Sequence, residues 1–98
     1  MEINKIVDNG MLQMSLSGRL DTVTSSAFAE EVNAITSDVK ELVLDLSNLE
    51  YVSSAGLRVI LTAQKKMNIQ GSMIVKNAND TIMEIFEITG FIDILNVE

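Results

Sequence analysis

The stretch "LEYVSSAGLRVILTAQKKM", Leu49 to Met67, decides how this chain folds. A short apolar segment passes through two serines, an alanine and a glycine directly into an amphipathic pattern. Leu57, Ile60 and Leu61 form an apolar stripe, and polar or charged side chains gather on the opposite face. This spacing predicts a helix over residues 54–68 that begins immediately after a strand.

The segments upstream of this stretch have the pattern of strands. "ELVLDLS", residues 41–47, contains four apolar side chains, as a strand covered on both faces requires, and we expect it in the centre of a sheet. Residues 2–7 and 11–17 alternate roughly between apolar and polar types, and the "DNG" between them is a hairpin signal. The chain is therefore expected to open as two antiparallel strands.

Two further helices and two further strands complete the pattern. The spacing of Phe28, Val32 and Ile35 predicts a helix over residues 23–36. Downstream, "GSMIVKN" is typical of a strand, "NDTIMEIFEIT" of a helix ended by Gly90, and "FIDILNV" of a last short strand.

This order of elements indicates an α/β fold. Strand–helix–strand connections favour parallel pairing with right-handed crossovers. At 98 residues the chain is long enough for one domain, so we expect residues 1–98 to form a single domain. That domain should have a mixed sheet of about five strands, an N-terminal antiparallel hairpin, and helices packed on the sheet.

Composition narrows the class of protein. A hydrophobic content of 47% with 21% charged residues indicates a folded domain. The net charge of −7 argues against nucleic acid and anionic membranes as partners, and it either keeps the domain soluble or suits a basic protein partner. The start of the sequence does not resemble a signal peptide, and no apolar run is long enough to span a membrane. We expect a cytoplasmic protein without a cofactor or metal.

Few catalytic arrangements are available to this chain. With no histidine and no cysteine, the common ways of activating a nucleophile are missing. Lys65 and Lys66 lie about three helical turns from the two serines, roughly 15 Å, which is too far for a general base. Asp21 and Asp45 lie near loops and are the remaining acid–base candidates, although capping is the commoner role of such aspartates. An enzyme is not expected.

The two serines of the opening stretch have different predicted roles. Ser53 is placed to cap the helix, because its hydroxyl can accept a hydrogen bond from a free amide two or three residues on. Ser54 would then be the first helical residue and point outward, and Gly56 would leave room for an approaching group. A phosphate on Ser54 would be stabilised by the helix N-terminus. The residues alone leave a functional Ser54 and a redundant cap equally open.

The run "LVLDLSNLEYVSSAGLRVIL", preceded by "LSGRLD" and followed by "GFIDIL", resembles the STAS domain of sulphate transporters and anti-sigma factor antagonists. Nearly the whole chain takes part, in the same order, and it is most similar to the free-standing bacterial antagonists. The family's phosphorylation site, two residues before the motif glycine, falls on Ser54. The resemblance implies an anti-sigma factor that acts as a serine kinase on Ser54, and a serine phosphatase that reverses the modification.

The sequence departs from the family pattern in two places. Many antagonists have an aspartate before the phosphorylated serine, where this chain has Ser53, and that difference bears on kinase recognition. The family also commonly has a helix after the last strand, whereas this sequence ends at "NVE". Uncovered sheet surface of this kind would favour a homodimer or a partner. Asp21 matches a family aspartate beside the phosphorylation site, and we assign it to the partner-facing surface.

The resulting hypothesis is a partner-switching regulator. The unmodified form binds the kinase and frees a sigma factor, and phosphorylation releases the kinase. The alternatives are a STAS scaffold or small-ligand sensor that is never phosphorylated, and a hydrolase that uses Asp21 and Asp45. The expected partner-binding surface consists of Asp21, Thr22, Ser53, Ser54, Gly56, Leu57 and Arg58.

Overall fold

The N-terminal hairpin forms as its turn sequence predicts. In the computed structural model, which describes residues 1–98, β1 (Glu2–Asp8) and β2 (Met11–Leu20) pair antiparallel. Asn9 and Gly10 connect the strands with φ angles of 46° and 81°. Two consecutive positive φ angles are the signature of a type I′ turn, whose twist matches that of the strands. The expectation of an antiparallel hairpin is confirmed.

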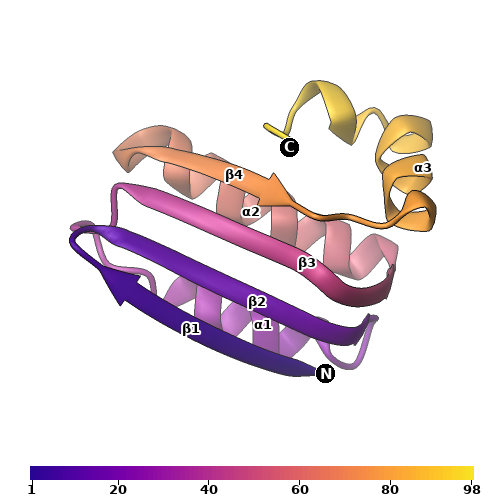
Figure 1. The fold of residues 1–98 in the computed structure, drawn as a ribbon, viewed down its shortest axis with the longest axis horizontal. Helices are drawn as coiled ribbons and strands as arrows, with labels where there is room; N and C mark the ends of the chain where they lie inside the picture. Colours follow the sequence, from indigo (N-terminus) through magenta and orange to yellow (C-terminus); the bar gives the residue numbers. More distant parts are fainter.

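The apolar strand of the opening stretch lies inside the sheet. β3 (Glu41–Val52) pairs in parallel with β2 on one side and with β4 (Ser72–Lys76) on the other. The sheet order is therefore β1-β2-β3-β4 (Figure 1). β3 is longer than the seven residues that the apolar run predicted, because pairing with β2 continues through two irregularities in register.

β3 lies inside the sheet as expected, but only one of its faces is covered by helices, so the expected cover on both faces is wrong: on the open face Glu41 and Ser47 are exposed. The side chains on its helix-covered face are fully buried, and they are Leu42, Leu44 and Leu46. Val43 points to the other face and is only 6% exposed. Its neighbours in register are Gln13 of β2 and Ile74 of β4.

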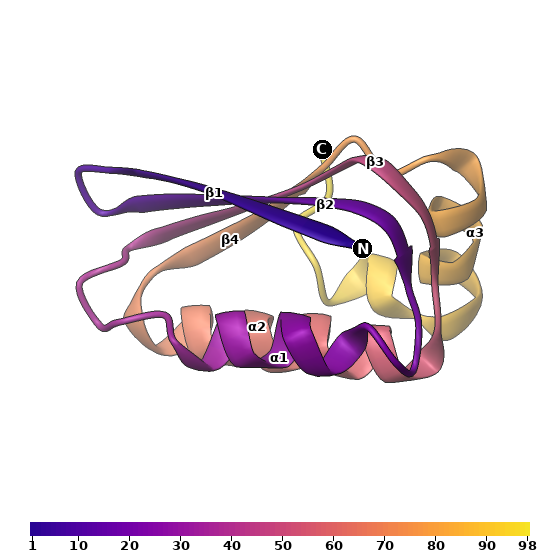
Figure 2. The ribbon, with the colours of Figure 1, turned by 90° about the horizontal axis from the view of Figure 1, so that it is seen from below.

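Two helices cover one face of the sheet. Figure 2 shows α1 (Ser25–Asn33) and α2 (Ser54–Gln70) side by side beneath the strands. Their fully buried side chains are Phe28 and Val32 of α1 and Ile60, Ala63 and Met67 of α2. α2 begins at the predicted residue. α1 is shorter than the predicted range 23–36: hydrogen bonds within the preceding loop hold residues 23 and 24 outside the helix, and the helix ends at Asn33.

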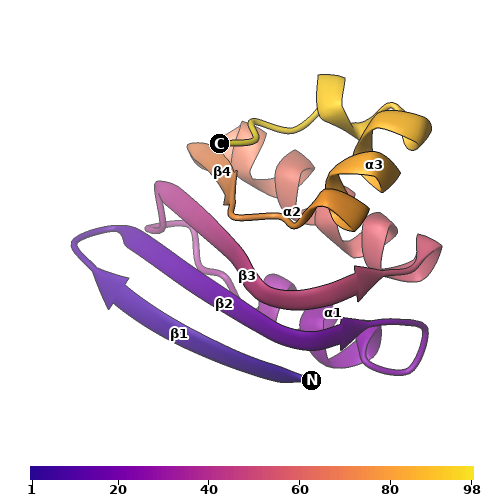
Figure 3. The same cartoon turned by 45° about the vertical axis from the view of Figure 1, so that its right-hand side comes forward.

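The third helix lies at one end of the molecule (Figure 3). α3 (Asp80–Thr89) is capped by Asn79, whose side-chain oxygen accepts a hydrogen bond from the Ile82 amide at 2.8 Å. The same side chain donates to the Leu49 carbonyl at 3.1 Å, which ties the start of α3 to β3. The helix ends at Gly90 with a left-handed φ of 81°, as the sequence predicts.

The segment "FIDILNV" differs from its prediction. It was expected to be a strand, but Phe91–Asp93 form a short 3-10 helix and only Val97 pairs with the sheet, as a parallel bridge to Val75. Phe91, Ile92 and Leu95 pack on the core at helical rather than alternating spacing. The α/β fold with a mixed sheet is confirmed, with four strands and this one bridge.

Candidate functional site

The predicted site residues lie where β2 and β3 end. The two strands run parallel, so the loop after Leu20 and the start of α2 emerge at the same edge of the sheet. The Ser53 amide donates a hydrogen bond to the Leu20 carbonyl at 2.8 Å and holds the two segments together. Loops at this edge of a parallel sheet are the usual position for binding groups.

Asp21 organises the loop between β2 and α1. Its Oδ1 accepts hydrogen bonds from the amides of Val23 and Thr24, both at 3.0 Å. The Thr24 hydroxyl in turn accepts a bond from the Asp21 amide at 2.9 Å and lies 2.8 Å from the Arg19 carbonyl, to which it can donate. These contacts fix the loop, and they leave Thr22 exposed beside the half-buried Asp21.

Asp21 carries its negative charge at neutral pH. The hydrogen bond from the Thr24 amide holds the pKa of Asp21 below its ordinary value. The Val23 amide and the positive charge of Arg19 lower it further. An ionised, hydrogen-bonded carboxylate of this kind contributes shape and negative charge to the surface.

The two serines occupy the positions that the sequence predicts. Ser53 Oγ accepts a hydrogen bond from the Gly56 amide at 3.2 Å and caps α2. Ser54 is the first residue of the helix, its side chain is exposed, and its hydroxyl makes no hydrogen bond within the chain. The first turn of α2 contains no acidic residue. The helix start therefore presents a free hydroxyl beside unpaired amides and carries no compensating negative charge.

Gly56 and Leu57 face the interior, which corrects one expectation. A Cβ atom on Gly56 would lie 2.7 Å from Leu20 Cγ and 2.9 Å from Val52 Cγ2. Gly56 therefore lets α2 approach the ends of β2 and β3, and it does not leave space for an incoming group. Leu57 is only 6% exposed. These two residues support the surface from below.

Arg58 lies four residues after Ser54 on α2 and is exposed. It forms no ion pair, and the only ion pair in the structure joins Lys5 and Glu31. A phosphate on Ser54 would thus find a free cation one helical turn away.

Two features beside this site do not follow from the sequence pattern. Val23 is 82% exposed, because it lies in the loop and not in the helix where the apolar spacing placed it. The Arg19 guanidinium lies 4.6 Å from the centre of the Tyr51 ring, in a cation–π contact between the ends of β2 and β3. The strand register, which pairs these two residues, would have revealed the contact.

The two aspartates proposed for a hydrolase do not form a pair. Asp45 lies opposite Ser15 in register, whereas Asp21 follows the end of β2, six residues and about 20 Å of extended chain beyond Ser15. Burial by itself raises the pKa of Asp45, but hydrogen bonds from the Ser47 amide and the Asn77 side chain outweigh it and lower the pKa. Two separated, ionised carboxylates are unsuited to the shared acid–base role.

Comparison with known proteins agrees with this architecture. A family model of the STAS domain matches residues 2–98. BtrV of Bordetella bronchiseptica, named as an anti-sigma factor antagonist, is 38% identical over 95 residues, which cover 91% of this chain and 78% of that protein. The chain therefore belongs to the anti-sigma factor antagonist family of STAS domains.

Solved structures share the fold. The crystal structure of an anti-sigma factor antagonist from Mycobacterium paratuberculosis has a TM-score of 0.87 at 24% identity, covering 98% of this chain and 83% of that one. SpoIIAA in its unphosphorylated form has a TM-score of 0.83 at 18% identity, covering 99% and 88%. The phosphorylated form of SpoIIAA, from Bacillus, has a TM-score of 0.77 at 16% identity, covering 99% and 91%.

All helices of this chain are too short or too polar to cross a bilayer.

Proposed function

We propose that this chain is the switchable antagonist of an anti-sigma factor that is also a serine kinase. The unmodified chain binds the kinase and thereby frees a sigma factor. Phosphorylation of Ser54 ends the complex, and a serine phosphatase restores the binding form. The proposal rests on one observation: Ser54 is exposed at the first position of α2 with its hydroxyl free, while Ser53 provides the cap.

The surroundings of Ser54 suit a phosphorylation site. A phosphoserine carries a charge of about −1.5 to −2 at neutral pH. The unpaired amides of the α2 N-terminus and the free cation of Arg58 both stabilise negative charge at that point. Phosphorylation should therefore leave the helix intact. Relatives of this fold are known in both states, since SpoIIAA has structures in unphosphorylated and phosphorylated forms.

The proposed partner surface is the edge of the sheet around Ser54. Its exposed members are Thr22, Ser54 and Arg58, with Asp21 and Ser53 half-buried between them. Gly56 and Leu57 belong to it as the packing that holds the helix start in place. Release follows from the phosphate itself, because a doubly charged group is costly to desolvate in a close-packed interface.

The chain is proposed to work in the cytoplasm as one STAS domain over residues 1–98, through protein contacts and without direct binding of nucleic acid. Its net charge of −7 supports a protein partner over an anionic polymer.

Partner capture in the native host tests this proposal. Tagged wild type, Ser54→Ala and Ser54→Asp are used as bait, and the bound kinase is measured by quantitative mass spectrometry. Ser54→Ala should recover as much kinase as the wild type, and the amount recovered with Ser54→Asp should be lower by a factor of about ten or more. Ser72→Asp is the matched control, because Ser72 is an exposed serine at the start of β4, the opposite end of the sheet. Equal recovery by both Ser54 variants would favour the unphosphorylated scaffold.

A further inference from the structure

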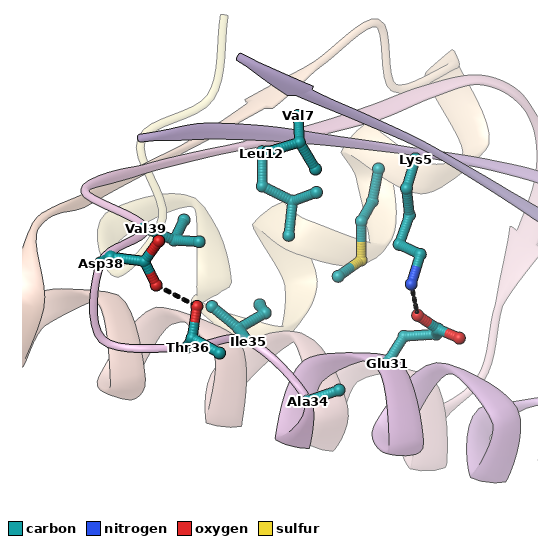
Figure 4. Close-up of a pocket in the computed structure, with 10 residues that line it drawn as sticks. Lys5, Val7, Leu12, Glu31, Ala34, Ile35, Thr36, Asp38 and Val39 are labelled. Carbon is teal, nitrogen blue, oxygen red and sulfur yellow. Dashed lines mark hydrogen bonds and ion pairs between the residues drawn. The ribbon is translucent and has the colours of Figure 1, made fainter. Parts of the chain in front are cut away.

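A cavity of about 190 Å³ lies beneath the β1–β2 hairpin, beside the end of α1 (Figure 4). Six of its ten lining residues are apolar. Leu12 reaches into it from the sheet, and Ile35 faces Leu12 from below. The cavity therefore has the apolar lining and concave shape of a small-molecule site.

Polar groups stand at two sides of this cavity. On one side, Lys5 Nζ and Glu31 Oε2 form an ion pair at 2.5 Å. On the other side, the Thr36 hydroxyl donates a hydrogen bond to the Asp38 carboxylate (Figure 4). The apolar side chains of Leu12 and Ile35 lie between the two polar sides.

The charge of the lining is unbalanced. The single lining cation, Lys5, is already paired with Glu31, whereas the Asp38 carboxylate has only a neutral hydroxyl as its side-chain partner. The bond from Thr36 holds the pKa of Asp38 below its ordinary value, so the carboxylate is charged at neutral pH. The positive charge of Lys40, which is not a lining residue, lowers this pKa further, and its Nζ donates to the Ser37 carbonyl at 2.9 Å. Counted alone, the lining residues carry one negative charge in excess, which disfavours binding of an organic anion.

We propose that this cavity binds a small organic cation with an apolar body, an alkyl or aralkyl amine whose ammonium group pairs with Asp38. An apolar cavity of about 150 Å³ accommodates benzene, so this one fits an apolar body of about six to eight heavy atoms. The ammonium group would satisfy the Asp38 carboxylate while the hydrocarbon lies against Leu12 and Ile35.

This site is separate from the proposed phosphorylation site. Leu12 is at the beginning of β2, whereas Leu20, which packs beneath Gly56, is the last residue of that strand. The ligand would therefore occupy the opposite end of the sheet from Ser54. Binding of the amine and release of the kinase are independent properties, and each can fail without the other.

Three probes of equal chain length test the proposal: hexylammonium, hexanol and hexanoate, titrated into the ¹⁵N-labelled chain at constant pH and ionic strength. Hexylammonium should shift amide signals at the cavity residues, with a Kd of about 1 mM for seven heavy atoms. Hexanoate should bind about tenfold more weakly, because its charge is repelled by the lining. Asp38→Asn should weaken hexylammonium binding about threefold, as expected for a partly exposed pair.

Two further variants make the result decisive. Asp93→Asn, an exposed aspartate in the 3-10 helix and outside the cavity lining, should leave binding unchanged. Ile35→Phe fills the cavity and should abolish binding of all three probes in a chain whose spectrum remains folded. Equal binding of hexanoate and hexylammonium, or an unchanged Kd in Asp38→Asn, would overturn the cation assignment. Shifts located elsewhere, or none at 20-fold the expected Kd, about 20 mM, would overturn the site itself.

Discussion

α2 and α3 begin in the same way and differ at two positions. In each helix the side-chain oxygen of the N-cap residue accepts a hydrogen bond from the amide of the third helical residue. Ser53 Oγ accepts from the Gly56 amide at 3.2 Å, and Asn79 Oδ1 accepts from the Ile82 amide at 2.8 Å. The first helical residue is Asp80 in α3 but the neutral Ser54 in α2. The carboxylate of Asp80 thus supplies a negative charge at the start of α3, whereas no acidic residue lies in the first turn of α2.

The third helical position differs as strongly as the first. α3 buries the full side chain of Ile82 there, while α2 has Gly56 against Leu20 and Val52. The start of α2 therefore lies close against the ends of β2 and β3, and Ser54 is exposed above them. The start of α2 is thus packed more closely on the sheet than the start of α3, and it has room in its charge balance for a negative group. Four predictions test this comparison.

Adding a side chain at the third position of α2 should have the largest effect. Gly56→Val places a Cβ within 2.9 Å of Leu20 and Val52 side chains, so the free energy of unfolding should fall by about 2–3 kcal/mol. Ile82→Val puts the same residue at the matching position of α3 and should cost only about 1 kcal/mol. Urea unfolding measures the free energy of unfolding of both variants, compared at equal m-value. Equal losses of stability would contradict the closer packing of α2 on the sheet.

The two caps should differ by a smaller amount. Ser53→Ala removes one hydrogen bond and should cost about 1 kcal/mol. Asn79→Ala should cost about 2 kcal/mol, because its amide also donates to the Leu49 carbonyl. The readout is the urea midpoint of each variant. A larger loss for Ser53→Ala than for Asn79→Ala would contradict the assigned contacts.

Exchanging the first residues of α2 and α3, serine and aspartate, should stabilise the helix that gains the aspartate and destabilise the one that loses it. Ser54→Asp should raise the free energy of unfolding by about 0.5 kcal/mol, and Asp80→Ser should lower it by a similar amount. Both changes arise from the helix N-terminal charge, so they should shrink in about 1 M salt, where the Debye length is about 3 Å. Destabilisation by Ser54→Asp at low salt would show that the start of α2 does not accept negative charge.

The smallest effect concerns Arg58. Phosphoserine at position 54 and the cation at position 58 have the favourable helical order, and their coupling should be about 0.3–0.5 kcal/mol. Thermal unfolding of phosphorylated and unphosphorylated chains, with Arg58 and Arg58→Ala, forms a double-mutant cycle. Lys65→Ala is the control, because Lys65 is an exposed cation further along the same helix. A coupling no larger than that of Lys65 at low salt would rule out the pair.

Local chemistry explains why much of the fold could be predicted from the sequence. The hairpin followed from the turn residues Asn9 and Gly10, and the end of α3 from Gly90, because positive φ angles select these residue types. The apolar run of β3 marked an inner strand, because Leu42, Leu44 and Leu46 are buried under the helices and Val43 is buried between its neighbours in the sheet. Ser53 was identified as a cap from its position before the apolar stripe of α2.

The predictions that were wrong depend on tertiary contacts. The inward orientation of Gly56 depends on how closely α2 approaches β2, which no local pattern specifies. The segment after Gly90 was mistaken for a strand because its apolar side chains pack on the core through a short turn, and only Val97 reaches the sheet. The loop position of Val23 depends on the hydrogen bonds between Asp21 and Thr24. These contacts join residues whose pairing appears only in the folded chain.

Phosphorylation by the captured kinase tests whether Ser54 controls the complex. The anti-sigma factor recovered with unmodified bait is incubated with the wild-type chain and ATP, and the product is mapped by mass spectrometry while the complex is followed by size-exclusion chromatography. The account predicts one phosphate, on Ser54, dissociation of the complex, and neither event with Ser54→Ala. A phosphate on Ser53, or a complex that survives full phosphorylation of Ser54, would contradict it.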